Sequence, residues 1–173
     1  MGRYVLAVRV PEALEHQMLR AKARLKKTGI TIDWGRLPPH VTVMPPFSME
    51  NERALRALMQ NFPRIIEATS ATTTLEWLSQ HPTLALMLVN GSCSGLMQNT
   101  RKALEGIGVP KWGSNETFPH ITLARSVEEG DKVAVFECLN AIGWPSSLAL
   151  RRITLFEEDE HGTYRESAGC LSR

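Results

Sequence analysis

The sequence predicts an α+β fold made of two lobes related by a pseudo-twofold axis, with largely antiparallel sheets, flanking helices and a central cleft. Two observations lead to this prediction. A tetrapeptide of proline, histidine, an aliphatic residue and threonine occurs twice, at Pro39–Thr42 and Pro119–Thr122, and its histidines stand 80 positions apart in a chain of 173 residues. Segments with strand-like and helix-like patterns also follow one another in the same order in both halves. Self-similarity at a fixed offset indicates a duplicated structural unit.

The repeat extends beyond the two tetrapeptides. An apolar run that begins at Tyr4 recurs at Leu84, again 80 positions later. Further matches lie at this offset or within two positions of it: Lys22-Ala23 with Lys102-Ala103, Gly29-Ile30 with Gly108-Val109, and Trp34-Gly35 with Trp112-Gly113. We therefore treat residues 1–173 as a single bilobal domain whose halves span roughly 3–80 and 83–173.

The composition is that of an ordinary globular protein. Hydrophobic residues make up 43% of the chain and charged residues 22%, which allows a buried core. The net charge of +2 is compatible with an anionic ligand but not with a bulk nucleic-acid binder. No apolar run approaches the roughly 18 residues that a membrane helix needs, and no signal-peptide pattern is present, so we expect a soluble cytoplasmic protein with no membrane partner. The three cysteines follow no metal-binding spacing.

The first half begins with a predicted strand over 4–10, which is rich in apolar and β-branched residues. Pro11 suits the first turn of a helix, and Gly29 is a suitable residue to end it. Apolar residues at helical spacing give this helix one stripe that faces the core. The stripe consists of Leu14, Met18, Ala21 and Leu25.

The first tetrapeptide, the first of two signatures, lies in a predicted strand over 40–44. We expect Pro45-Pro46 to stop this strand. Ser48 is the candidate N-cap of a helix over 49–61. The residues expected to face the core from this helix are Leu55, Leu58, Met59 and Phe62. One or two strands are expected within 65–78, where β-branched residues are frequent.

The second half repeats this order, with a strand over 84–89, a helix capped by Ser92 or Ser94, and the second signature strand over 120–124. A helix opened by Asp131, a strand over 148–156 and a short strand near 164–171 complete the chain. The residues expected to face the core from the two helices are Leu96, Leu104 and Ile107 in the first, and Val133, Phe136, Leu139 and Ile142 in the second.

The two signatures carry the chemistry. Every second side chain of a strand points to the same face, so His40 projects together with Thr42, and His120 with Thr122. If the halves pack about a pseudo-twofold axis, two imidazoles and two hydroxyls meet in one cleft. Histidine titrates near pH ~6.5, so one imidazole can remove a proton while the other supplies one. The threonine hydroxyls can hydrogen-bond phosphate oxygens. This is phosphoester chemistry that needs no metal and no cofactor.

The motifs Pro39-His40-Val41-Thr42-Val43 and Phe118–Arg125 resemble those of the 2H phosphoesterase superfamily, and within it the group of 2′-5′ RNA ligases and RNA 2′,3′-cyclic phosphodiesterases. The resemblance spans nearly the whole chain. It implies an enzyme that opens 2′,3′-cyclic phosphates of RNA ends or nucleotides to 2′-phosphates, with ligation as the reverse reaction. We expect the protein to be a monomer.

The resemblance also implies roles for single residues. His40 would protonate the departing ribose oxygen and His120 would activate water. Thr42 and Thr122 would bind the phosphate, and Arg125 would supply charge to it. One departure is Pro45-Pro46-Phe47 after the first signature, where well-characterised bacterial cyclic phosphodiesterases carry Phe-Leu-Gly.

Several aromatic residues have two interpretations. Trp34 and Trp112 recur in both halves and either stack nucleobases or pack near the interface between the lobes. Phe47 either stacks beside the cleft or packs in the core. The alternative for Arg125 is a surface arginine without a ligand.

Other functions are compatible with the same residues. The enzyme could cleave 2′-5′ linkages in oligonucleotides, or act on a small metabolite such as an ADP-ribose cyclic phosphate. A different class is a non-catalytic module that binds RNA or nucleotides. A metal site built on the two histidines lacks a third ligand at suitable spacing.

Overall fold

The computed structural model describes residues 2–61, 69–78, 83–89, 91–109, 118–150 and 153–167. These residues form a mixed α+β fold with one eight-stranded, antiparallel sheet, which confirms the predicted fold class. The elements in chain order are β1 (Gly2–Arg9), α1 (Glu12–Lys27), β2 (His40–Met49), α2 (Glu52–Asn61), β3 (Thr69–Leu78), β4 (Thr83–Val89), α3 (Gly91–Gly106), β5 (His120–Ala124), α4 (Lys132–Asn140), β6 (Ser147–Leu150), β7 (Ile153–Glu158) and β8 (Tyr164–Glu166).

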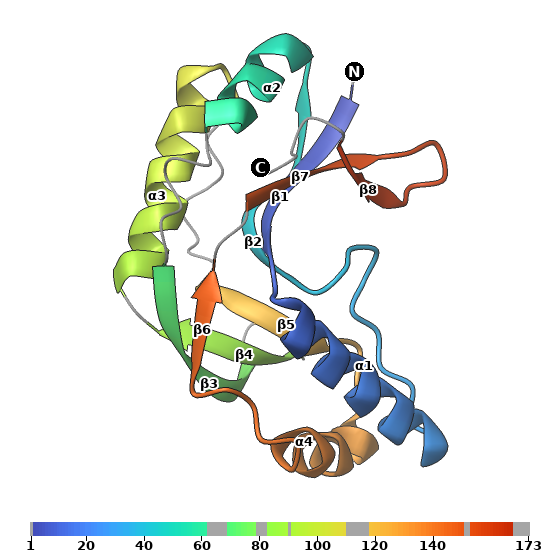
Figure 1. The fold of residues 1–173 in the computed structure, drawn as a ribbon. Coiled ribbons are helices and arrows are strands. Elements are labelled where there is room, and N and C mark those ends of the chain that lie inside the picture. The colour runs from blue at the N-terminus through green and yellow to red at the C-terminus, as the bar shows by residue number, and fades with distance from the viewer. Residues whose placement is uncertain are drawn as a thin grey trace.

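The two signature strands, β2 and β5, lie next to each other in the middle of the sheet, whose order is β6-β3-β4-β5-β2-β1-β7-β8. The strand that follows α2, which is β3, pairs with β4. The strand β7, which comes after α4, pairs with β1. The first half of the chain therefore gives β3 to the other half of the sheet, and the second half gives β7 and β8. The sequence analysis expected separate sheets in two lobes, whereas the described residues form one continuous sheet (Figure 1).

The ladder between β2 and β5, which we call the seam, is short. It consists of a single residue pair, Val41 with Ile121. Around it the helices pack in two pairs: α1 lies with α4 at one end of the molecule and α2 with α3 at the other (Figure 1). No helix of the described part is long and apolar enough to cross a membrane.

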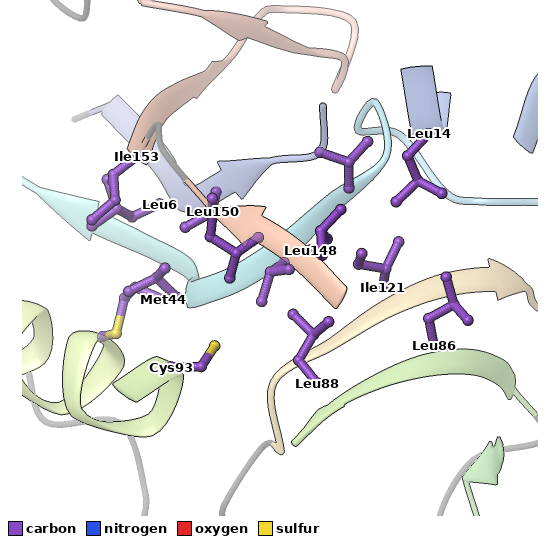
Figure 2. Packing of buried hydrophobic residues seen from close by; sticks show 14 of the residues in the cluster. Leu6, Leu14, Met44, Leu86, Leu88, Cys93, Ile121, Leu148, Leu150 and Ile153 are labelled. Carbon is purple, nitrogen blue, oxygen red and sulfur yellow. The ribbon is translucent and has the colours of Figure 1, made fainter. Parts of the chain in front are cut away.

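The main core covers one face of the sheet. Figure 2 shows Ile121 of β5 beside Leu86 and Leu88 of β4 and residues of β6. The predicted stripe of α1 is confirmed, because Leu14, Met18, Ala21 and Leu25 are at most 2% exposed. Fully burying an aliphatic side chain of this size contributes about 1.5–3 kcal/mol. The core therefore fixes one face of the signature strands and leaves the other for function.

Two predicted boundaries around β2 are wrong. The strand continues through Pro45-Pro46 to Met49, because the ladder with β1 is irregular there and β5 no longer pairs with this part of β2. A proline needs no ladder partner at such a position. The N-cap of α2 is Asn51 and not Ser48, since the Asn51 Oδ1 accepts a hydrogen bond from the Ala54 backbone N–H at 3.1 Å.

Three predictions in the second half also need correction. The helix α3 begins at Gly91, so Ser92 and Ser94 lie inside it. In α4, Val133 is 69% exposed and Val135 is buried in its place. The expected strand over 148–156 is two strands, β6 and β7, that lie in different halves of the sheet. In the sequence, Arg151-Arg152 interrupts the apolar run between Leu150 and Ile153, and this break was the available signal for two strands.

Other predictions are confirmed or lie outside the described part. Leu55, Met59, Leu96, Leu104 and Leu139 are buried as expected, and Ile107, Phe136 and Ile142 pack partly buried against the core. The strand over 120–124 has the predicted bounds. Phe62, 65–68 and the side chain of Leu58 are not among the described residues.

We predict that Ile121→Ala lowers the free energy of unfolding by about 2–5 kcal/mol, because it removes a fully buried side chain at the seam. Urea unfolding of wild type and variant measures this. Val133→Ala is the matched control, since its side chain is exposed, and it should change the stability by less than about 0.5 kcal/mol. Equal stability of Ile121→Ala and wild type would contradict the central place of the seam.

Candidate active site

The two signatures occupy matching positions in β2 and β5. His40 and His120 are the first residues of their strands, and both strands show the same burial pattern over five residues, with histidine and threonine partly buried and the aliphatic residue between them buried. Val41 pairs with Ile121 in the antiparallel ladder. This register places His40 across from Thr122 and Thr42 across from His120, all on the face that the main core leaves uncovered.

Small side chains surround the threonines. In the sheet, Ala7 of β1 is the neighbour of Thr42, and Ala85 of β4 is the neighbour of Thr122. Both alanines are fully buried. Ala7 packs in a small cluster with Val5 and Phe156.

Each imidazole is held by a backbone carbonyl two residues before it. His40 Nδ1 donates to the carbonyl of Pro38 at 2.7 Å, and His120 Nδ1 donates to the carbonyl of Phe118 at 2.8 Å. A carbonyl oxygen can only accept, so this contact assigns the proton to Nδ1 in both rings. The other nitrogen, Nε2, is then the one that can exchange protons with a substrate.

The proline of each tetrapeptide explains why this contact forms twice. Pro39 and Pro119 stand between the accepting carbonyl and the histidine, and the pyrrolidine ring fixes the φ angle there. The carbonyl of the preceding residue is thereby held in a defined direction. On the Nε2 side of His40, the Thr42 hydroxyl lies at 3.1 Å and donates to the neutral ring.

The electrostatics of the site favour a neutral His40. Burial lowers the pKa of His40 below its ordinary value of 6.5, and the positive charges of Arg125 and His120 lower it further. The hydrogen bond to the Pro38 carbonyl acts in the opposite direction. In the free protein these effects together favour the neutral ring of His40.

Arg125 follows β5 and is tied to the loop that leads to His40. Its backbone N–H donates to the carbonyl of Asp33 at 3.0 Å. Its guanidinium lies over Gly35, where an added Cβ would stand 3.1 Å from Nη1. Gly35 has φ of +89°, a backbone conformation that favours glycine. The structure thus brings an exposed guanidinium within electrostatic range of His40; its role as a phosphate ligand stays a prediction.

The aromatic candidates for base stacking are packed where the structure describes them. Phe47 is only 7% exposed, and its ring centroid lies 6.0 Å from that of Tyr4. Trp34 is partly buried against the core, and its Nε1 donates to the carbonyl of Leu123 at 2.8 Å. Phe47 therefore offers no face for a nucleobase, and the packing interpretation fits both residues. Trp112 lies outside the described residues.

Two further residues near the site escaped the sequence analysis. Phe118 is 65% exposed immediately before the second signature. Its alternation with His120 was the signal available in the sequence. Arg101 of α3 donates its Nε to the carbonyl of Val43 at 3.1 Å, just beyond the seam, and burial lowers its pKa. Nothing in the sequence connects Arg101 with β2.

A separate open hollow lies at the start of α1, where Arg9, Glu12, Glu15 and His16 form part of its lining. Arg9 is also the neighbour of His40 in the sheet, but it pairs with the Glu15 carboxylate at 3.2 Å. The carboxylates of Glu12 and Glu15 repel phosphate. The hollow therefore does not compete with the histidine site for an anion.

The described residues contain no group of three or more His, Cys, Asp or Glu that could hold a metal ion. What the site offers is instead two imidazoles anchored through Nδ1, two hydroxyls and a nearby guanidinium. Such groups can transfer two protons and hold an anion between them.

Comparison with known proteins shows the fold. No family model and no curated protein sequence matches the chain. A crystal structure of a phosphoesterase matches with a TM-score of 0.61 at 19% identity, over 96% of this chain and 94% of that one. Escherichia coli LigT complexed with 3′-AMP matches with a TM-score of 0.61 at 21% identity, over the same shares of 96% and 94%.

A third structure, TT0787 of Thermus thermophilus, has a TM-score of 0.63 at 17% identity and covers 95% of this chain and 94% of its own. The fold of this chain is therefore that of LigT and of a known phosphoesterase. These likenesses, at 17–21% identity, show a shared fold.

We predict that Arg125→Gln raises the pKa of His40, because the guanidinium charge lowers it in the wild type. Titration followed by NMR of the histidine ring should place the wild-type midpoint below the ordinary value of about 6.5 and the variant midpoint above the wild-type value. Arg36→Gln is the control, since Arg36 is an exposed arginine of the same loop that bonds to the carbonyl of Gly162. A His40 midpoint that both substitutions leave unchanged would remove Arg125 from the site.

Proposed function

We propose that this chain is a metal-independent phosphodiesterase that opens 2′,3′-cyclic phosphates of nucleotides or RNA ends to 2′-phosphates. One observation carries the proposal. The two signatures pair in antiparallel direction, which puts two carbonyl-anchored imidazoles and two hydroxyls on the same face of the sheet. An acid and a base on opposite sides of one phosphorus atom are what in-line displacement requires.

The proposed reaction balances within these groups. One imidazole takes a proton from water as the oxygen of that water attacks phosphorus. The bond from phosphorus to the 3′-oxygen breaks, and the other imidazole gives its proton to that oxygen. The products are a 3′-hydroxyl and a 2′-phosphate monoester. The two rings end with exchanged protonation states, which proton exchange with solvent restores.

The resemblance assigns the acid to His40 and the base to His120. In ligation a 5′-hydroxyl would take the place of water, and the two histidines would keep these roles. A neutral His40 in the empty site does not conflict with a role as acid. The negative charge of a bound phosphodiester favours the protonated ring and so acts against the burial that lowers the pKa of His40. Substrate binding would thus favour the protonated form of His40, which its role as the acid requires.

Thr42 and Thr122 would donate to the two non-bridging oxygens, and Arg125 would add a positive charge beside them. The likeness to LigT, whose crystal contained 3′-AMP, supports a nucleotide as the ligand.

A 2′-5′ linkage is the second candidate substrate. Its cleavage would use the same two histidines as acid and base. A binding module without turnover is less well supported, because both rings are anchored through Nδ1 in the same way, an arrangement that binding alone does not need.

We predict that a short RNA ending in a 2′,3′-cyclic phosphate is converted to the 2′-phosphate in the presence of EDTA. His40→Ala and His120→Ala should each lower kcat by about 10²–10⁴-fold, because each removes one of the two proton transfers. His161→Ala is the matched control, since this histidine is exposed in the turn before β8 and should leave kcat unchanged. A wild-type kcat in either His40→Ala or His120→Ala would contradict the two-histidine mechanism.

The pH dependence follows from the same pair. We predict a bell-shaped profile of kcat/KM, because the free enzyme must carry one neutral and one protonated imidazole. His40 must be protonated to act as the acid, so it sets the limb on which kcat/KM falls as the pH rises. The midpoint of this limb should lie below pH 6.5, since the pKa of His40 is lowered in the free protein. Arg125→Gln should move this limb to higher pH. A profile with one limb only, or a limb that does not move, would contradict the assignment.

A further inference from the structure

We propose that Phe118 and Val89 form a stacking platform for the nucleobase of the substrate, directly beside the phosphate site. The inference rests on the proposed function and goes further, because it names the substrate class: cyclic phosphates that carry a base, in preference to base-free ones.

Phe118 lies on the same face of the sheet as His120 and Thr122 of β5. Along the chain, Phe118 is exposed, Pro119 is buried, His120 is partly exposed and Ile121 is buried. This alternation turns the Phe118 side chain toward the face of His120. Two residues along an extended strand span about 7 Å, so the Phe118 ring lies roughly one nucleotide unit from the imidazole.

Val89 extends the apolar surface onto the neighbouring strand. His120 pairs with Met87 of β4, and the Leu88 backbone N–H donates to the carbonyl of Pro119 at 2.8 Å. Continued by one residue, this register brings Val89 next to Phe118. Val89 is 58% exposed, although Leu88 beside it is buried in the core. Two of the large hydrophobic residues that the described part exposes are therefore cross-strand neighbours beside the site.

The platform has a polar border. Thr72 of β3 pairs with Val89, and Thr74 pairs with Met87, which lies beside His120. Both threonines are exposed. An apolar surface with a few hydroxyls at its edge is the usual lining of a nucleotide-sized site. The hydroxyls can reach the polar edge of a base that rests on Phe118.

The other half of the site has no such platform. The residue two positions before His40 is Pro38, which is partly buried. Its neighbour Leu37 packs against a small cluster of Val5, Ala7 and Phe156. Isolated exposed hydrophobic residues are common on protein surfaces. Here the exposed aromatic residue stands at one end of an otherwise symmetric pair of signatures, which points to the β4–β5 side as the position of the base.

The test compares Phe118→Ala with wild type on two substrates: adenosine 2′,3′-cyclic phosphate and the base-free 1-O-methylribose 2′,3′-cyclic phosphate. Stacking of one base on an aromatic side chain is lost on substitution by alanine at a cost that corresponds to about 5- to 100-fold in affinity. We expect kcat/KM on the nucleotide to fall by this factor, mainly through KM. On the base-free substrate it should stay within about twofold.

Two variants complete the design. Phe118→Trp should retain activity on the nucleotide, because tryptophan also offers a face for stacking. Val133→Ala removes an exposed apolar side chain on α4, away from the signatures, and should change neither substrate.

Each other outcome overturns the inference in a recognisable way. An equal loss on both substrates means that Phe118 acts through the His120 ring and not on a base. No loss on either means that the base lies elsewhere. If wild type opens neither substrate, the proposed function fails, and calorimetric binding of 3′-AMP to wild type and Phe118→Ala then decides the platform alone: equal affinities reject it.

Discussion

The pairing of Val41 with Ile121 is the contact on which the rest of the molecule depends. It is the single ladder pair between β2 and β5, and it joins the two halves of the sheet. Both side chains point into the core, at 1% and 0% exposure. The residues on either side of each therefore point away from the core, and these residues are the histidines and threonines. This one buried apolar pair thus joins the two halves of the sheet and also determines where the site lies.

The antiparallel direction of this pairing has a chemical consequence. It sets each histidine of one signature across from the threonine of the other, so the site has an approximate twofold axis between them. A phosphate on this axis meets an imidazole on each side. The backbone completes the arrangement, because the carbonyls before Pro39 and Pro119 hold the two Nδ1 atoms in the same way. Side chains from only two strands and two carbonyls build the proposed catalytic pair.

Part of this could be predicted from the sequence. The repeated tetrapeptide predicted two strands with histidine and threonine on one face, and the helical stripe at Leu14, Met18, Ala21 and Leu25 predicted α1, because both signals are local and periodic. The exchange of β3 and β7 between the halves could not be predicted in this way. It depends on which strands pair over long distances, and local pattern carries no information on that choice.

The differences at single residues have physical causes as well. Pro45-Pro46 stops a strand that is paired on both sides, but β2 is paired only with β1 at that point. Phe47 was a candidate for stacking because of its position after the signature, yet the irregular ladder turns its ring toward Tyr4. Phe118 is part of the second motif, but its place in the sequence does not mark it as a binding residue. Its exposure, and with it the proposed platform, depends on the register of β4, which only the structure gives.

The most direct test of the central claim is a titration with inorganic phosphate, followed by NMR of ¹⁵N-labelled histidine. If both signatures face one anion, the Nε2 signals of His40 and His120 shift together with one dissociation constant, while those of the exposed His16 and His161 stay in place. Shifts in only one of the two rings, or two different dissociation constants, would show that the signatures do not share a site and would contradict the account.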